Sequence, residues 1–468
     1  RGSAAAAGAA GLRAGRRVAS AGLPRPTPDA PQRRPRPAPA GAAYAPPVPT
    51  RPNLAPFVVA VAIGSTAYIA AFTAAALAAR EITGSAQLSG LPSAFGTLGT
   101  AVGIGLLSAI MGRRGRRAGL LVGLAIAVLG ATGSVTAVVA GSFVLLVAGS
   151  VAIGFGNAAI QLARYAASDL VAPERRAAVV GVVVWGSTVG AVLGPNLLQP
   201  AGAAAGLLGR PALQGGIAVA LVGFVLMFVV TALFVHVRPV RDVELPPPTE
   251  GGIVAPDAAA AVDERPASRR ALLASTRARI AVVAMVSGQI VMVLVMTMTP
   301  VHVHDMGHGL ATVGFVISAH TLGMFALSPL SGRLVVRFGT IPVIYAGFAV
   351  LLVAALLSAF ARETDIPVLA LGLFLLGYGW NLAFVAGSSL LTAGASLADR
   401  IRLQGTVDVG VWVASGIASV SSGVLLDRFG YPVLSLVAGA LLALPAVAIW
   451  LGWRSGAAGP DASTRPTA

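Results

Sequence analysis

The chain contains no cysteine and no lysine, and it has few charged residues of any kind. Its 468 residues are 56% hydrophobic and only 11% charged, with a mean hydropathy of +0.83. A soluble domain carries about 25% charged residues, so the polar groups here are too few to cover a water-exposed surface. The sequence therefore excludes a soluble enzyme and predicts an all-α protein that crosses the membrane many times.

Each missing residue type also excludes a kind of chemistry. Without cysteine there is no disulfide framework, no thiolate nucleophile and no Cys-ligated metal. All 33 basic residues are arginine, so a P-loop, which needs its lysine, cannot form. The chain also lacks the HExxH and GxSxG motifs and a facing pair of deep carboxylates. We therefore expect no enzymatic activity and no cofactor, and any transport must run on an ion gradient or on the gradient of the solute.

The net charge of +16 comes largely from one end of the chain. Residues 1–52 contain nine arginines and a single acid, together with many Ala, Pro and Gly residues. This composition predicts a disordered basic tail. The tail could contact anionic lipid headgroups or be a transit peptide, but a solvated tail is the simpler interpretation. The charge therefore does not indicate a nucleic-acid partner.

Apolar runs of about 20 residues recur along the rest of the chain, and each is long enough to cross ~30 Å of hydrocarbon. Twelve spans are predicted. They are Leu54–Ala79, Leu91–Met111, Leu120–Ala140, Phe143–Ala167, Ala177–Leu198, Gly216–Val235, Ile280–Thr299, Val313–Leu334, Val343–Phe360, Pro367–Leu391, Leu403–Leu426 and Pro432–Trp453.

A polar stretch divides these spans into two groups of six. We expect an N-terminal bundle at 53–235, a cytoplasmic linker at 236–278, a C-terminal bundle at 279–454 and a cytoplasmic tail at 455–468. With both termini in the cytoplasm, the inner loops and adjoining span ends carry 20 arginines outside the basic tail, and the outer loops carry four. This bias follows the positive-inside rule. The predicted location is the cell membrane.

The two halves also repeat each other. Arg113 and Gly115 lie between the second and third spans, and Arg337 and Gly339 lie 224 residues further on, between the eighth and ninth spans. A repeated half joined by a cytoplasmic linker is the architecture in which one bundle rocks against the other to give alternating access.

These loops resemble the major facilitator superfamily from about Leu54 to Arg454. The family signature G-x-L-x-D-R-x-G-R-R is matched in part in both halves, although its aspartate is replaced by Gly112 and Val336. The matching residues are Gly332, Leu334, Arg337 and Gly339 in the second half, and Arg113, Gly115, Arg116 and Arg117 in the first. The resemblance implies twelve helices in two pseudo-symmetric six-helix bundles, transport by alternating access and a monomer.

The fifth span contains Gly186, Gly190, Gly194 and Pro195. This run resembles the glycine-proline motif of the drug:proton antiporters in the same superfamily. Glycines four apart form one flat helix face, and proline leaves a carbonyl free and bends the helix. Ordinary packing of small residues between membrane helices is the alternative interpretation.

Ionisable residues inside a span are costly, so each is a functional candidate. Asp408 lies near the cytoplasmic end of the eleventh span and could carry a proton, or it could form a structural ion pair with Arg164 of the fourth span. Arg164 could also contact an anionic substrate or extend to the membrane surface. His320 in the eighth span could take part in proton coupling or be a neutral, hydrogen-bonded helix residue.

Uncharged polar residues in the spans are candidates for the substrate cavity. They are Asn157, Gln161, Gln289, Trp380 and Asn381; Trp380 could stack on an aromatic or cationic solute, or simply pack. The outer loop after the seventh span contains His302, His304 and His308 with Asp305. These are weak candidates for a metal site, and a solvated loop is the better interpretation.

The sequence as a whole predicts a secondary active transporter for a small organic solute. Proton-coupled efflux, like that of drug:proton antiporters, is the favoured activity. The alternatives are proton-coupled uptake of a small metabolite and transport of a metal or metal complex. The expected partners are the solute, protons and the lipid bilayer.

Overall fold

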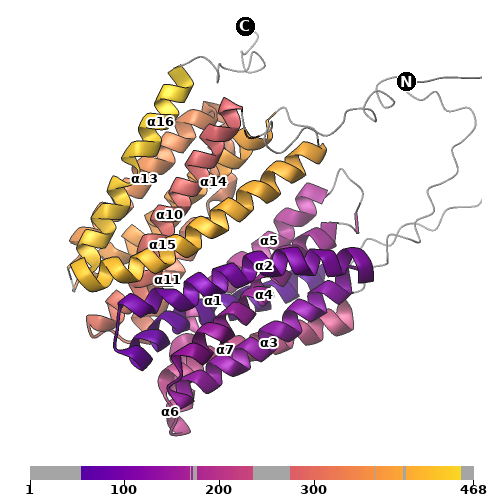
Figure 1. Cartoon of the computed structure of the whole chain (residues 1–468), viewed down its shortest axis with the longest axis vertical. Helices are drawn as coiled ribbons and strands as arrows, with labels where there is room; N and C mark the ends of the chain where they lie inside the picture. Colours follow the sequence, from indigo (N-terminus) through magenta and orange to yellow (C-terminus); the bar gives the residue numbers. More distant parts are fainter. Residues whose placement is uncertain are drawn as a thin grey trace, which may run out of the picture. The chain divides into compact units, whose positions relative to one another are not determined.

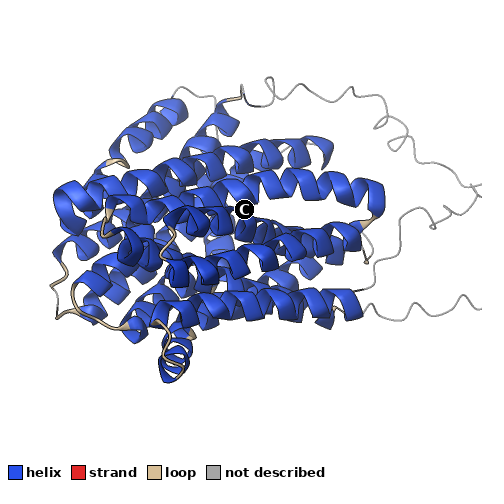
Figure 2. Ribbon diagram, turned by 60° about the horizontal axis from the view of Figure 1, so that its bottom comes forward, coloured by secondary structure: helices blue, strands red, loops and turns tan. Residues whose placement is uncertain are grey.

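The computed structural model describes residues 54–168, 170–171, 176–235, 273, 275–362, 364–393 and 397–454. In these ranges the chain forms helices and short connections, and it contains no strand (Figure 2). Three predicted segments lie wholly or mostly outside the described residues. They are the basic tail, the linker except for a few residues at its end, and the C-terminal tail.

The first half of the chain forms a group of helices that Figure 1 draws in indigo to magenta. The boundaries are α1 (Ala55–Thr83), the short 3-10 helix η1 (Gln87–Gly90), α2 (Leu91–Arg114), α3 (Arg116–Ala140), α4 (Phe143–Ser168), α5 (Arg176–Asn196), α6 (Leu198–Leu207) and α7 (Ala212–Phe234). The helix α5 occupies the place of the fifth predicted span, Ala177–Leu198, and α6 extends the chain beyond it at an angle of 41°.

The second half forms a corresponding group. Its helices are α10 (Thr276–Asp305), α11 (Leu310–Phe325), α12 (Ser328–Phe338), α13 (Thr340–Phe360), α14 (Ile366–Thr392), α15 (Leu397–Ala440) and α16 (Ala443–Arg454). The predicted eighth span, Val313–Leu334, falls within one membrane-length segment, Leu310–Phe338. This segment is interrupted between α11 and α12, where Pro329 is the second residue of α12.

Ten helical segments of the described chain are long and apolar enough to cross a membrane, and the bent pair α5–α6 makes an eleventh. One of the ten, Thr406–Arg454, has 49 residues, or about 73 Å of helix at ~1.5 Å per residue, more than twice a ~30 Å membrane core. It contains a break at Gly430, where φ is 77° and ψ is 171°. Counting the two sides of this break separately gives the twelve predicted spans.

Three sharp reversals in the described chain use a single glycine with nearly the same backbone conformation. Gly115 has φ 89° and ψ 159°, Gly339 has φ 86° and ψ 168°, and Gly430 is given above. This region of backbone space is essentially accessible only to glycine. The sequence repeat of Gly115 and Gly339 is thus also a repeat of backbone geometry.

Two clusters of buried apolar side chains form the core. One contains residues of the first half alone, such as Leu107, Leu124 and Phe224. The other contains the core of the second half together with first-half residues. These are Ala70, Ala74 and Ala76–Ala79 of α1, and Ala137, Leu146, Leu198, Leu213 and Ile217. The cores of the two halves are therefore continuous at the end of the bundle where α1 terminates. We call this the closed end, and the end with Arg113–Arg117 the basic end.

Candidate functional site

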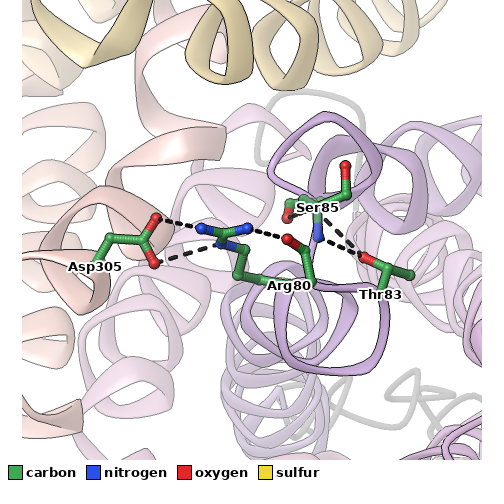
Figure 3. A network of polar contacts seen from close by, with 6 residues as sticks. Arg80, Thr83, Ser85 and Asp305 are labelled. Carbon is green, nitrogen blue, oxygen red and sulfur yellow. Dashed lines mark hydrogen bonds and ion pairs between the residues drawn. The ribbon is translucent and has the colours of Figure 1, made fainter.

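An ion pair joins the two halves at the closed end. Arg80, in the last turn of α1, contacts Asp305 at the end of α10, with Nη2 to Oδ2 and Nε to Oδ1 both at 3.4 Å (Figure 3). Arg80 also donates to the carbonyl of Gly84, and Thr83 and Ser85 bond to each other beside it. The pair is partly exposed, with 30% and 39% of the two side chains accessible, so its energy is reduced by solvent screening.

The proline of α5 creates a second contact between the halves. Pro195 has no N–H, so the carbonyl of Ala191 lacks its donor within the helix. Thr321 of α11 offers a donor: its Oγ1 lies 3.1 Å from that oxygen and also 3.1 Å from the carbonyl oxygen of Ser318 in its own helix, so its single hydrogen is shared between the two acceptors. One residue further along, Ser318 donates to the carbonyl of Val192 at 3.0 Å. The bent helix is therefore stabilised by side chains of the opposite half.

The helix α15 forms a third contact between the halves at the same end, with the 3-10 helix η1. Ser419 donates to the carbonyl of Gly90 at 3.1 Å. A Cβ atom added at Gly423 would lie 2.5 Å from the carbonyl oxygen of Gln87, so only glycine permits this close approach. Together with the shared core, these contacts hold the two halves of the chain against each other near the closed end.

The glycines of the fifth span pack against α1. Added Cβ atoms would lie 2.8 Å from the carbonyl oxygen of Val58 at Gly186 and 2.6 Å from that of Thr66 at Gly194. Gly190 would clash with the carbonyl of Ala62. The predicted flat face is thus a helix-helix interface within the first half.

Asp408 on α15 and Arg164 on α4 belong to different halves. Both side chains are half-buried, and the positive charge of Arg164 acts on the carboxylate of Asp408. Within the described part of the chain the two do not form a direct ion pair, and Nε of Arg164 is buried without a hydrogen-bond partner. The predicted structural ion pair between them is therefore not formed in this structure.

His320 lies away from this pair, within the second half. It is fully buried on α11, and its Nδ1 is 3.0 Å from the carbonyl oxygen of Leu373 on α14. Its Nε2 is buried without a partner among the described residues. The carbonyl can only accept, so Nδ1 carries a hydrogen and donates it in this bond.

Gln289 and Trp380 lie together in the second half. The indole N–H of Trp380 donates to Oε1 of Gln289 at 2.7 Å, and Nε2 of Gln289 donates to Ser415 of α15 at 2.8 Å. Phe384 stacks on Trp380, with ring centroids 5.0 Å apart. Three helices, α10, α14 and α15, thus hold a partly exposed aromatic pair in a fixed orientation.

Asn157 and Asn381 occupy comparable places in α4 and α14, yet their contacts differ. Asn157 is buried and donates to Thr100 of α2 at 3.3 Å; Gln161, one turn later, is half-buried. Asn381 donates to the carbonyl of Met324 at 2.7 Å and accepts from Ser331 at 2.6 Å. It therefore satisfies polar groups at the break between α11 and α12.

The histidine-rich segment does not form the predicted loop. The helix α10 continues through Pro300 to Asp305, so His302 and His304 lie in its last turn. The ring of His302 stacks on Tyr431 at 4.0 Å, and His308 follows the helix. Among the described residues no group of three His, Cys, Asp or Glu side chains is placed to hold a metal ion.

The signature loops lie at the basic end. Arg117 donates to the carbonyl of Ala232 at the end of α7, and Arg116 contacts the sulfur of Met111. An added Cβ at Gly332 would meet nothing within 4 Å, whereas Gly339 forms the turn described above. The ring of Phe338 lies under the guanidinium of Arg337 at 5.3 Å.

A third copy of the signature was missed in the sequence. Gly423, Leu425, Asp427, Arg428 and Gly430 match every fixed position of G-x-L-x-D-R-x-G, including the aspartate that the other two copies lack. This copy ends at the closed end, where its first glycine packs against η1 and its last forms the chain reversal. A search of the whole sequence with the first eight positions of the signature, G-x-L-x-D-R-x-G, would have found it, whereas the final two arginines are replaced by Tyr431 and Pro432.

The fold and this site define a class of protein: a multi-pass membrane transporter made of two similar helical halves. The family model described as Major Facilitator Superfamily matches residues 56–318 and 280–467. The chain belongs to the major facilitator superfamily.

Relatives and solved structures agree with this assignment. The MFS-type transporter YdeG of Bacillus subtilis (strain 168) is 34% identical over 403 residues, which cover 84% of this chain and 91% of YdeG. The riboflavin transporter RfnT of Brucella anthropi is 26% identical over 411 residues, covering 86% and 96%. The crystal structure of the human organic anion transporter MFSD10 superposes with a TM-score of 0.56 at 19% identity, covering 85% and 100%.

Proposed function

We propose that this transporter exports a small, planar organic solute in exchange for protons, with Asp408 as the group that exchanges the proton. It acts as a monomer in the cell membrane, with both termini and the basic end in the cytoplasm. The closed end then faces outwards, and the substrate enters from the cytoplasm between the two bundles at 53–235 and 279–454. The positive-inside bias of the arginines supports this orientation.

One observation supports the proposal: Asp408 and Arg164 carry opposite charges, are both half-buried, and belong to helices of different halves. A proton on Asp408 removes its attraction to Arg164, which changes the relative energy of the two states of the transporter. His320 is less suited to this role, because its Nδ1 is bound to a carbonyl inside the second half. The glycine-proline run of α5, typical of drug:proton antiporters, supports exchange and export.

The aromatic pair of Trp380 and Phe384 supports a planar solute. A flat ring system can stack on an aromatic face, and such contacts contribute about 0.5–1.5 kcal/mol beyond burial. The amide of Gln289 fixes the indole by a hydrogen bond, so the surface is already oriented before the solute binds. Asn157 and Gln161 on α4 are the proposed contacts from the other half.

Uptake of a metabolite is the second candidate. It is favoured by the similarity to RfnT, whose name assigns it riboflavin, a planar heteroaromatic compound. The same aromatic surface would suit such a solute. The two candidates differ in the direction of the proton gradient that drives accumulation.

Flux into proteoliposomes tests both the coupling and the direction. A panel of cationic dyes and riboflavin is offered under a pH gradient of either sign, with the wild type beside Asp408→Asn and Arg164→Gln. We expect gradient-driven flux in the wild type and only solute-driven exchange in Asp408→Asn. Gradient-driven flux that survives Asp408→Asn would refute Asp408 as the coupling group, and accumulation of riboflavin in the symport direction would favour uptake over export.

A further inference from the structure

A lateral groove lies on the side of the first half, between α1, α6 and α7. Its volume is about 580 Å³, and its walls include Ile63, Ala204, Ala218, Val222 and Leu226. Val222 and Leu226 are 58% and 48% exposed, so the groove is open along its length. The only ionisable group among its lining residues is Arg210, in the connection between α6 and α7.

The bend in the fifth span frames this groove. Because α6 departs from α5 at 41°, it approaches α7 near the closed end, where Gly215 packs against the carbonyl of Ala201. The helix α7 also packs on α1, at Gly216 beside Ala74 and at Gly223, where an added Cβ would lie 2.7 Å from that of Ala67. The groove lies on the exposed side of this α1–α7 contact, beside α6.

The groove has the length of one membrane leaflet. From Gly215 to Leu226 the helix α7 rises about 16 Å at ~1.5 Å per residue, close to half of a ~30 Å hydrocarbon core. Apart from Arg210, its polar lining residues are Thr66 and Gln214, and the hydroxyl of Thr66 is bonded to Ala62 in its own helix at 2.9 Å. An acyl chain thus matches both the length and the polarity of the walls.

The mouth of the groove carries groups that suit an anionic headgroup. Arg210 is exposed, and in the described part of the chain no carboxylate pairs with it. Gln214 lies beside it, and its Oε1 is buried with no donor among the described residues. A phosphate accepts hydrogen bonds from a guanidinium, and a headgroup hydroxyl would supply the donor that Gln214 lacks.

We propose that the lateral groove binds one acyl chain of phosphatidylglycerol, with the phosphate on Arg210 and a glycerol hydroxyl on Oε1 of Gln214. The lipid fills the space that the bend opens between α1, α6 and α7. It therefore covers the helix interface at Gly223 and stabilises the bent form of the fifth span.

Native mass spectrometry of the purified full-length chain tests the proposal. The protein is delipidated and offered equal amounts of phosphatidylglycerol and phosphatidylcholine with identical chains. We expect one phosphatidylglycerol to be retained in preference. In Arg210→Gln this retention should fall about fivefold, the effect of one basic group near a lipid surface, whereas Arg362→Gln, a change of an exposed arginine outside the groove, should leave it unchanged.

A second pair of variants tests the acyl chain. Ala204→Phe places a ring in the groove, and Ala203→Phe places the same ring on an exposed position of α6 that does not line it. We expect the first to lose the lipid and the second to keep it. Equal retention of the two lipids, equal retention by both variants, or a lipid-free dimer that occupies the groove with a second copy would overturn the proposal.

Discussion

The bond between Thr321 and the carbonyl of Ala191 gives a direct test of how the closed end is held. The change Thr321→Val keeps the shape of the side chain and removes its hydroxyl. Pro195 cannot donate to the same carbonyl, so the buried oxygen of Ala191 loses the donor that Thr321 offers at 3.1 Å. An unsatisfied buried group costs about 1–3 kcal/mol.

This cost applies only while the end is closed, because the carbonyl meets water once α5 and α11 separate. The equilibrium between the closed and the open form should therefore shift towards opening by about 5–150-fold. Since the chain has no cysteine, a single Ala94→Cys change supplies an unambiguous reporter. Ala94 is 3% exposed and lies at the contact of α2 with α15, away from Thr321.

The assay is the rate at which a membrane-impermeant maleimide labels Ala94→Cys from the closed end. Thr321→Val should raise this rate by at least about fivefold. Thr321→Ser keeps the hydroxyl and should label like the parent. Thr132→Val, on α3, removes a hydroxyl that bonds only within its own helix and should also label like the parent. An unchanged rate in Thr321→Val would refute the role of this bond in closure.

Three further changes test other parts of the site. Gly190→Ala should abolish folding or transport because the new Cβ meets the backbone of α1. Gly181→Ala should be tolerated because its new Cβ meets nothing within 4 Å. The yield of folded protein and the solute flux are measured for both variants. Asp305→Asn removes only an exposed ion pair worth about 0–1 kcal/mol, so labelling of the cysteine reporter should change less than about fivefold. Asn381→Ala leaves buried groups at the α11–α12 break unsatisfied, at about 1–3 kcal/mol each, and should lower the melting temperature in detergent.

Much of the fold could be predicted because a membrane helix must satisfy its backbone internally and match the thickness of the bilayer. Ten spans, the bent fifth and the break at Gly430 follow from this rule. His302 and His304 were assigned to a loop because they follow the apolar run of the seventh span. In the structure α10 continues to Asp305, and His302 stacks on Tyr431, a contact that sequence spacing does not reveal.

The contacts between the halves could be predicted only in part. The free carbonyl created by Pro195 follows from covalent chemistry, but its donor, Thr321, lies 126 residues away along the chain from Pro195 and is known only from the structure. The polar residues selected from the predicted spans also have different structural roles, and the sequence alone does not show which residue has which role. Asn381 bridges a helix break, whereas Trp380 presents an aromatic surface.

The three glycine reversals described above have a mechanical consequence. At Gly115 and Gly339 the glycine is the only residue between one helix and the next, and at Gly430 the reversal occurs inside α15. Such joints contain no spare chain, so a tilt of the first helix of a pair is transmitted directly to the second. The two helices of each pair are therefore expected to move together as one rigid unit. Inserting a folded domain at any of these three glycines would separate the two helices and uncouple their movement.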